Sequence, residues 1–194
     1  MLPYATVQRV EIIDPAATVR PAPPSSVQPS PPAVSPQQPP RNVANGVRTD
    51  RNLIRQLNEH AVETSRIGAN TFRLEAYLWH DYMPMSGPRT SRGGRAMLAT
   101  NTLISTNHVG IPNNIRMVKQ FVIYRDQVWV SNYTNEEIPH YDESQAAYHM
   151  ERISRGGPNW GIGIRVDVIS QILDTATNQV YYIRIRNVHV ERVD

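Results

Sequence analysis

The chain contains no cysteine in 194 residues. This absence excludes a disulfide framework and thiolate chemistry. A domain of about 150 residues buries roughly two thirds of its surface, so it folds without such cross-links. No apolar run approaches the roughly 20 residues of a membrane span, and the N-terminus lacks a signal-peptide core. We therefore expect a protein of the cytoplasm or of a virion, not one secreted by a signal peptide.

Lysine is almost absent as well. Of the 20 basic residues only Lys119 is lysine, and the others are arginine. Codon bias in a GC-rich genome explains this pattern, and so does a use of arginine for planar contacts at interfaces or on phosphates. The net charge of +3 is too small to indicate a nucleic-acid-binding protein by itself.

Charge is missing altogether from residues 21–40, which hold nine of the sixteen prolines. Proline fixes φ and removes a hydrogen-bond donor, so this stretch is predicted to be an extended polyproline II segment reaching roughly 60 Å. We divide the chain into a Pro-rich N-terminal arm, 1–40, and a single domain, 41–194. At their junction Pro36, Pro39 and Arg41 fit the pattern PxxPxR, which aromatic grooves of SH3-type domains bind.

Hydrophobic periodicity predicts the elements of the domain. A helix is expected from the Thr49-Asp50 cap until before Gly68, and a second from the capping box that begins at Asp142 until Gly156-Gly157. Alternation predicts strands at 70–79, 97–106, 115–125, 128–133, 161–173 and 179–190. Strands without βαβ alternation favour a mainly β, antiparallel domain, sandwich or barrel-like, with two short helices.

The two C-terminal strands have one apolar and one charged face. We expect the apolar face in the core (Ile164, Val166, Ile183 and Ile185). The opposite face carries three arginines beside a tyrosine (Arg165, Arg184, Arg186 and Tyr182), an arrangement that can hold single-stranded nucleic acid by stacking. Asp167 lies on the same face and is expected to neutralise one of the arginines.

The sequence carries no pattern typical of catalysis. His140, Asp142 and His149 match no metal-ligand spacing, and helix capping explains Asp142 better. No GxSxG elbow is present, and the two SerArgGlyGly segments lack the form of a phosphate-binding loop. We therefore expect no enzyme activity, no catalytic or metal-binding residues and no cofactor.

A long polar loop at residues 80–96 carries three further arginines (Arg89, Arg92 and Arg95). Long loops in compact domains are either functional or disordered. Two methionines, Met83 and Met85, accompany them, and methionine favours adaptable protein contacts over phosphate contacts. This loop is therefore predicted to meet a protein partner.

These observations indicate a structural or assembly protein of a large complex, whose arm docks on neighbouring subunits. A virus or phage particle, with the chain as a capsid-associated component, is favoured by analogy of architecture. The alternative is a nucleic-acid-binding or adaptor module that uses the Arg/Tyr face of the C-terminal hairpin. The expected partners are other protein subunits rather than a membrane.

Overall fold

The computed structural model describes residues 42–82, 96–134 and 147–194. Within these ranges the chain forms one helix and nine strands. In chain order they are β1 (Gly46–Thr49), α1 (Arg51–His60), β2 (Thr64–Ile67), β3 (Asn70–Asp81), β4 (Met97–Ser105), β5 (Ile115–Tyr124), β6 (Gln127–Asn132), β7 (His149–Gly157), β8 (Arg165–Asp174) and β9 (Gln179–Val193).

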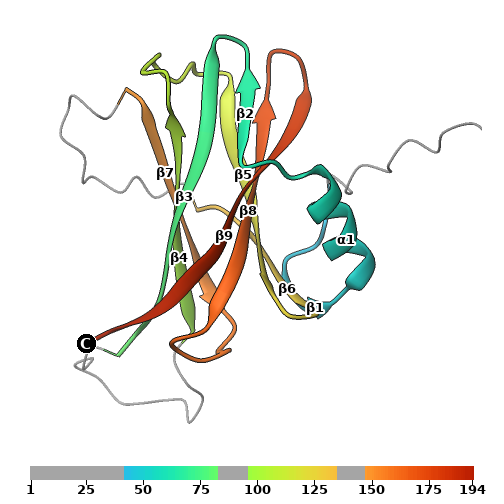
Figure 1. Ribbon diagram of the computed structural model, residues 1–194, viewed down its shortest axis with the longest axis vertical. Helices are drawn as coiled ribbons and strands as arrows, with labels where there is room; N and C mark the ends of the chain where they lie inside the picture. The colour runs from blue at the N-terminus through green and yellow to red at the C-terminus, as the bar shows by residue number, and fades with distance from the viewer. Residues whose placement is uncertain (1–41, 83–95, 135–146) are drawn as a thin grey trace, which may run out of the picture. The chain divides into compact units, whose positions relative to one another are not determined.

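The strands form a single mixed sheet that curls into a half-barrel (Figure 1). Their order is β1-β6-β5-β8-β9-β3-β4-β7, with β2 paired to β3. We call β1, β6, β5, β8 and the beginning of β9 the first half-sheet. The end of β9, together with β3, β4, β7 and β2, is the second half-sheet. The two ends approach each other where the Thr134 amide donates to the Ile153 carbonyl at 3.0 Å.

Strand β9 joins the two half-sheets. Its beginning pairs antiparallel with β8, and its end, from Val190 onward, pairs parallel with β3. A register shift at Val166/Val168 and a positive φ of 58° at Asn187 mark the bend between the two pairings. The expectation of a purely antiparallel sheet is therefore wrong at the β3–β9 pairing.

The main core fills the inside of the half-barrel. Alternate residues of β3 point inward (Phe72, Leu74 and Leu78), and they meet inward residues of the first half-sheet (Val122, Trp129, Val168, Ile172 and Ile183). Ile183 is fully buried, while Ile164 and Ile185 are partly buried against this cluster. The apolar face predicted for the C-terminal hairpin is thus confirmed, and the period of two in the sequence is its cause.

Helix α1 covers the outer face of the first half-sheet (Figure 1). The Asp50 side chain caps it by accepting from the Leu53 amide at 2.9 Å. Leu53 and Leu57 pack on outward residues of the sheet, among them Phe121 and Tyr182. A second core therefore lies on the opposite side of the sheet from the first.

The first helix is shorter than predicted. It ends at His60, and Ala61 already has extended dihedral angles. The next residue, Val62, bridges to β9: its amide donates to the Tyr182 carbonyl at 3.1 Å, and its carbonyl accepts from the Arg184 amide at 2.9 Å. The prediction that the helix continues towards Gly68 is wrong because these bonds return the chain to the sheet.

The predicted second helix is replaced by strand β7 over its described part. His149–Gly157 pairs antiparallel with β4, from Ile104↔His149 to Met97↔Gly157. Without β7, β4 would present a row of unpaired backbone groups. Pairing to this edge outweighs the weak helical spacing of Met150 and Ile153. Asp142, the predicted cap, lies outside the described residues.

Candidate functional site

An aromatic pair stands on the outer face of the second half-sheet. Tyr77 and Trp79 lie two residues apart on β3, so their side chains leave the same face. The rings stack with centroids 5.1 Å apart and an interplanar angle of 25°. Tyr77 is 43% exposed, whereas tyrosine and tryptophan rings in a core are largely covered. Trp79 is half-buried beside it. A stacked aromatic pair with one exposed ring is typical of a surface that binds another molecule.

This surface is formed by residues of β3, β4 and β9. We call it the Tyr77 face (Glu75, Tyr77, Trp79, Leu98 and Glu191). Leu98 of β4 and Glu191 of β9 lie directly beside Trp79 in the strand registers. The Tyr77 hydroxyl donates to Glu191 Oε2 at 3.1 Å. Burial raises the pKa of the Tyr77 hydroxyl, and the hydrogen bond and charge of Glu191 raise it further. At neutral pH the tyrosine therefore stays protonated and donates to the carboxylate.

The charge of the Tyr77 face is negative. Arg73 balances Glu75, with Nη1 at 2.6 Å from Oε1. Glu191 is exposed, and it forms no salt bridge within the described part of the chain. The face thus offers one aromatic stack, one aliphatic neighbour and one carboxylate whose charge no arginine balances.

Another candidate site is a depression between α1 and the β5–β6 turn, with a volume of about 520 Å³. Its walls include Arg51, Ile54 and Asn58 of the helix and Arg125 and Asp126 of the turn. Arg51 is 3.9 Å from Asp126, and the Arg125 guanidinium lies over the Tyr124 ring at 4.9 Å. Exposed arginines paired in this way are common on solvated surfaces and contribute little energy.

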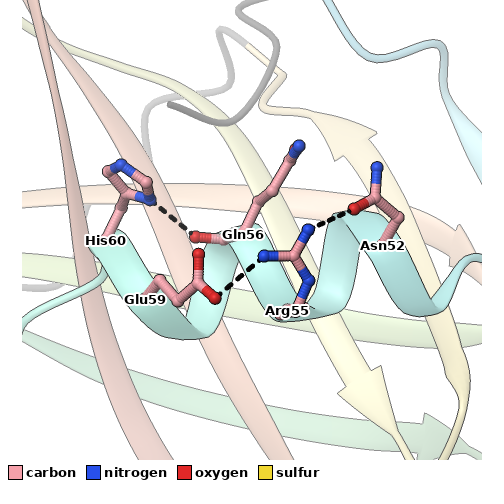
Figure 2. Close-up of polar contacts among 5 residues, drawn as sticks. All are labelled: Asn52, Arg55, Gln56, Glu59 and His60. Carbon is pink, nitrogen blue, oxygen red and sulfur yellow. Dashed lines mark hydrogen bonds and ion pairs between the residues drawn. The ribbon is translucent and has the colours of Figure 1, made fainter. Parts of the chain in front are cut away.

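The exposed polar face of α1 is held by contacts within the helix itself (Figure 2). Arg55 donates to Asn52 Oδ1 at 2.7 Å and forms an ion pair with Glu59 at 3.0 Å, while His60 Nδ1 lies 2.9 Å from the Gln56 carbonyl. Such pairs three and four residues apart stabilise a surface helix. This face is therefore explained by helix stability and is a weaker candidate than the Tyr77 face.

Polar side chains also cross the interior of the half-barrel. Asn101 of β4 donates to Gln120 Oε1 of β5 at 2.6 Å, and both residues are fully buried. Ser170, which lies opposite Gln120 on β8, forms a hydrogen bond with Tyr133. Burial raises the pKa of Tyr133 far above its ordinary value. The Asn101–Gln120 contact joins the two half-sheets, and the Tyr133–Ser170 contact lies within the first. Buried polar pairs of this kind favour one arrangement of strands over alternatives.

The C-terminal hairpin differs from the surface that the sequence predicts. Tyr182 is only 5% exposed because it packs beneath α1. The prediction that its ring is available beside the arginines is therefore wrong. Arg184 is half-buried and donates to the Asn58 carbonyl at 3.3 Å. The helix covers this face, a tertiary contact that alternation along β9 does not reveal.

The other two hairpin arginines are exposed. Arg165 donates to the Asn187 carbonyl at 3.1 Å, and Asp167 accepts from the Asn187 amide at 3.0 Å. Asp167 therefore fixes the backbone bend of β9, where an ion pair with one of the arginines was expected. Arg165, Arg184 and Arg186 do not form one continuous basic surface with an exposed aromatic ring.

The remaining predicted contact residues lie outside the described residues (Pro36, Pro39, Arg41, Arg89, Arg92 and Arg95). The arm 1–40 also lies outside them, and so does His140. Over residues 42–82, 96–134 and 147–194 no group of three metal-ligating side chains comes together. In the same ranges no helix is long and apolar enough to cross a membrane.

Comparisons with protein-family models, with curated proteins and with solved structures each found no match. The alternation of residues 70–79 already indicates that Tyr77 and Trp79 share one face of a strand. The hydrogen bond of Tyr77 to Glu191, 114 residues away along the chain, depends on the parallel β3–β9 pairing, which no sequence pattern indicates.

Proposed function

We propose that this chain is a structural protein that works by binding other protein subunits in a large assembly. The observation that carries the proposal is the Tyr77–Trp79 stack on an outer face of the sheet, in which the Tyr77 ring is exposed. Tyrosine and tryptophan are enriched at protein interfaces because they bury a large area and lose little conformational entropy. The β-rich body and the long Pro-rich arm favour a virus or phage particle as the assembly, by analogy of architecture.

The distribution of basic residues supports this proposal. The single lysine, Lys119, is 8% exposed, and its ammonium donates to the Val43 carbonyl. Burial lowers the pKa of Lys119, and the nearby charge of Arg48 lowers it further. Arginine is consequently the one strongly basic side chain on the protein surface. Interfaces are enriched in arginine and depleted of lysine, so this surface suits association with protein.

Nucleic-acid binding is not our proposal, because two features of the described surface speak against it. Tyr182 is buried and cannot stack on a base. The Tyr77–Trp79 pair lies next to Glu191, whose negative charge no arginine balances in the described ranges and repels phosphate. A protein partner is compatible with both features.

The proposal is tested by the state of association of the full chain. Sedimentation velocity over a wide range of concentrations, together with gradient sedimentation of extracts from the source cells, measures it directly. We expect the 22.0 kDa chain to self-associate or to sediment with a much larger protein particle. A chain that stays monomeric in both experiments would refute the proposal. A shift of labelled oligonucleotide at physiological salt, lost in an R89A/R92A/R95A variant, would favour the nucleic-acid alternative.

A further inference from the structure

We infer that the Tyr77 face binds the proline–arginine segment Pro36–Arg41 of a second copy of this chain. The inference rests on the proposed function and names the partner of the Tyr77–Trp79 stack. Extended proline segments dock on aromatic surfaces because their prolines pack on the rings. Such segments are already extended, so they lose little conformational entropy on binding. The Tyr77–Trp79 stack, with Leu98 beside it, supplies such a surface.

Charge complementarity fixes the choice of segment. Residues 21–40 carry no charge, and the first charged residue after them is Arg41. The Tyr77 face carries the carboxylate of Glu191, which accepts from the Tyr77 hydroxyl through Oε2. Its Oε1 forms no hydrogen bond within the described ranges, so it can accept from a guanidinium. The pattern PxxPxR thus meets aromatic rings and a carboxylate in one place.

The same chain cannot supply its own Arg41. Val43 is held under α1 by the bond from Lys119, and Lys119, Gln171 and Tyr182 form one row across β5, β8 and β9. From Tyr182, nine more residues of β9 lead to Glu191, a path of about 30 Å along the bent strand at a rise of 3.2–3.4 Å per residue.

The two residues of backbone between Val43 and Arg41 span at most about 7 Å, far less than the path along β9 from that row to Glu191. The partner that brings an arginine to Glu191 is therefore another molecule. An arm on one copy and a face on the next form a heterologous contact. Such contacts produce a reciprocal pair, a ring or a longer chain of subunits.

The test uses two full-length variants. R41E disables the arm, and Y77A removes the exposed ring from the face. The wild type is expected to self-associate, and each variant alone to associate at least tenfold more weakly; for Y77A the loss reaches about thirtyfold, as for an aromatic hot spot. A 1:1 mixture is expected to form a two-chain complex, because one variant keeps an intact face and the other an intact arm.

Charge reversal gives an independent readout that does not depend on truncating a ring. E191R alone weakens association about tenfold, and combining it with R41E in the same chain restores it. R20E in the arm and E63R on the exposed segment after α1 are matched controls that leave association unchanged. Thermal melting checks that each variant is folded.

The outcomes separate this inference from the proposed function. If the wild type associates but the mixture forms no complex and E191R has no effect, the docking inference is wrong and the assembly function stands. A wild type that is monomeric in solution yet sediments with a particle also refutes the docking inference alone. A wild type that neither self-associates nor sediments with a particle refutes both.

Discussion

Replacement of Gly157 by alanine tests how the two ends of the half-barrel meet. Gly157 ends β7, and the ring of Trp129 from β6 lies against it. A Cβ atom at residue 157 would be 2.7 Å from Trp129 Cζ3 and 3.0 Å from Met97 Cβ. Both distances are shorter than carbon–carbon van der Waals contact. Alanine therefore forces the ring or the strand to move.

Two opposing effects determine the magnitude. Overpacking a well-packed site costs about 1–3 kcal/mol. Replacing glycine by alanine also restricts the unfolded chain, which stabilises the folded state by about 0.4–1 kcal/mol. Overpacking wins here because Trp129 is 3% exposed and Met97 is fully buried, so neither can swing into solvent. With mid-range values of about 2 and about 0.7 kcal/mol for the two terms, we expect the free energy of unfolding to fall by about 1.3 kcal/mol.

Urea denaturation followed by tryptophan fluorescence measures this change, and thermal melting should show a decrease of about 2–4 °C per kcal/mol. Gly110→Ala is the matched control, because its nearest heavy atom would be the Ala147 carbonyl oxygen at 3.8 Å. Trp129→Phe in the Gly157→Ala background should recover about 1 kcal/mol, a coupling expected only of residues in contact. A Gly157→Ala variant as stable as the Gly110→Ala control would refute this packing of β6 against β7.

Three further predictions concern stability. Ile183→Ala should reduce the free energy of unfolding by about 2–5 kcal/mol, because the side chain is fully buried in the main core; a loss below about half a kcal/mol in urea denaturation would mean that β9 is out of register. Asp50→Ala should cost about 1 kcal/mol through loss of the α1 cap, with Asp50→Ser close to wild type in the same assay. Hydrogen bonds from Asn114, Thr177 and Ala176 lower the pKa of Asp174 below its ordinary value of 3.8. The ionised Asp174 carboxylate therefore stabilises the folded state above about pH 4, and this stabilisation is lost as the pH falls through the lowered pKa. Melting temperatures of wild type and Asp174→Asn should accordingly differ at pH 7 and converge in acid.

Sequence patterns alone determined most of the strands. Alternation predicted β3, β4, β5, β6, β8 and β9 nearly at their observed bounds, because a strand with one buried face shows its period directly. The Asp50 cap likewise predicted where α1 begins, since capping is a local hydrogen bond. The absence of cysteine and of nucleotide-binding loop patterns was also read directly from the residues.

Tertiary contacts decided the rest. Residues 149–157 form a strand because β4 offers an open edge, although their own spacing favoured a helix. Tyr182 is buried because α1 lies over the outer face of β9, and Tyr77 is exposed although it occupies the same kind of outward strand position. Period-2 alternation says which residues share a face, but only the packing of distant elements decides whether that face is covered. The meeting of Tyr77 with Glu191 follows from the parallel β3–β9 pairing, which no local pattern encodes.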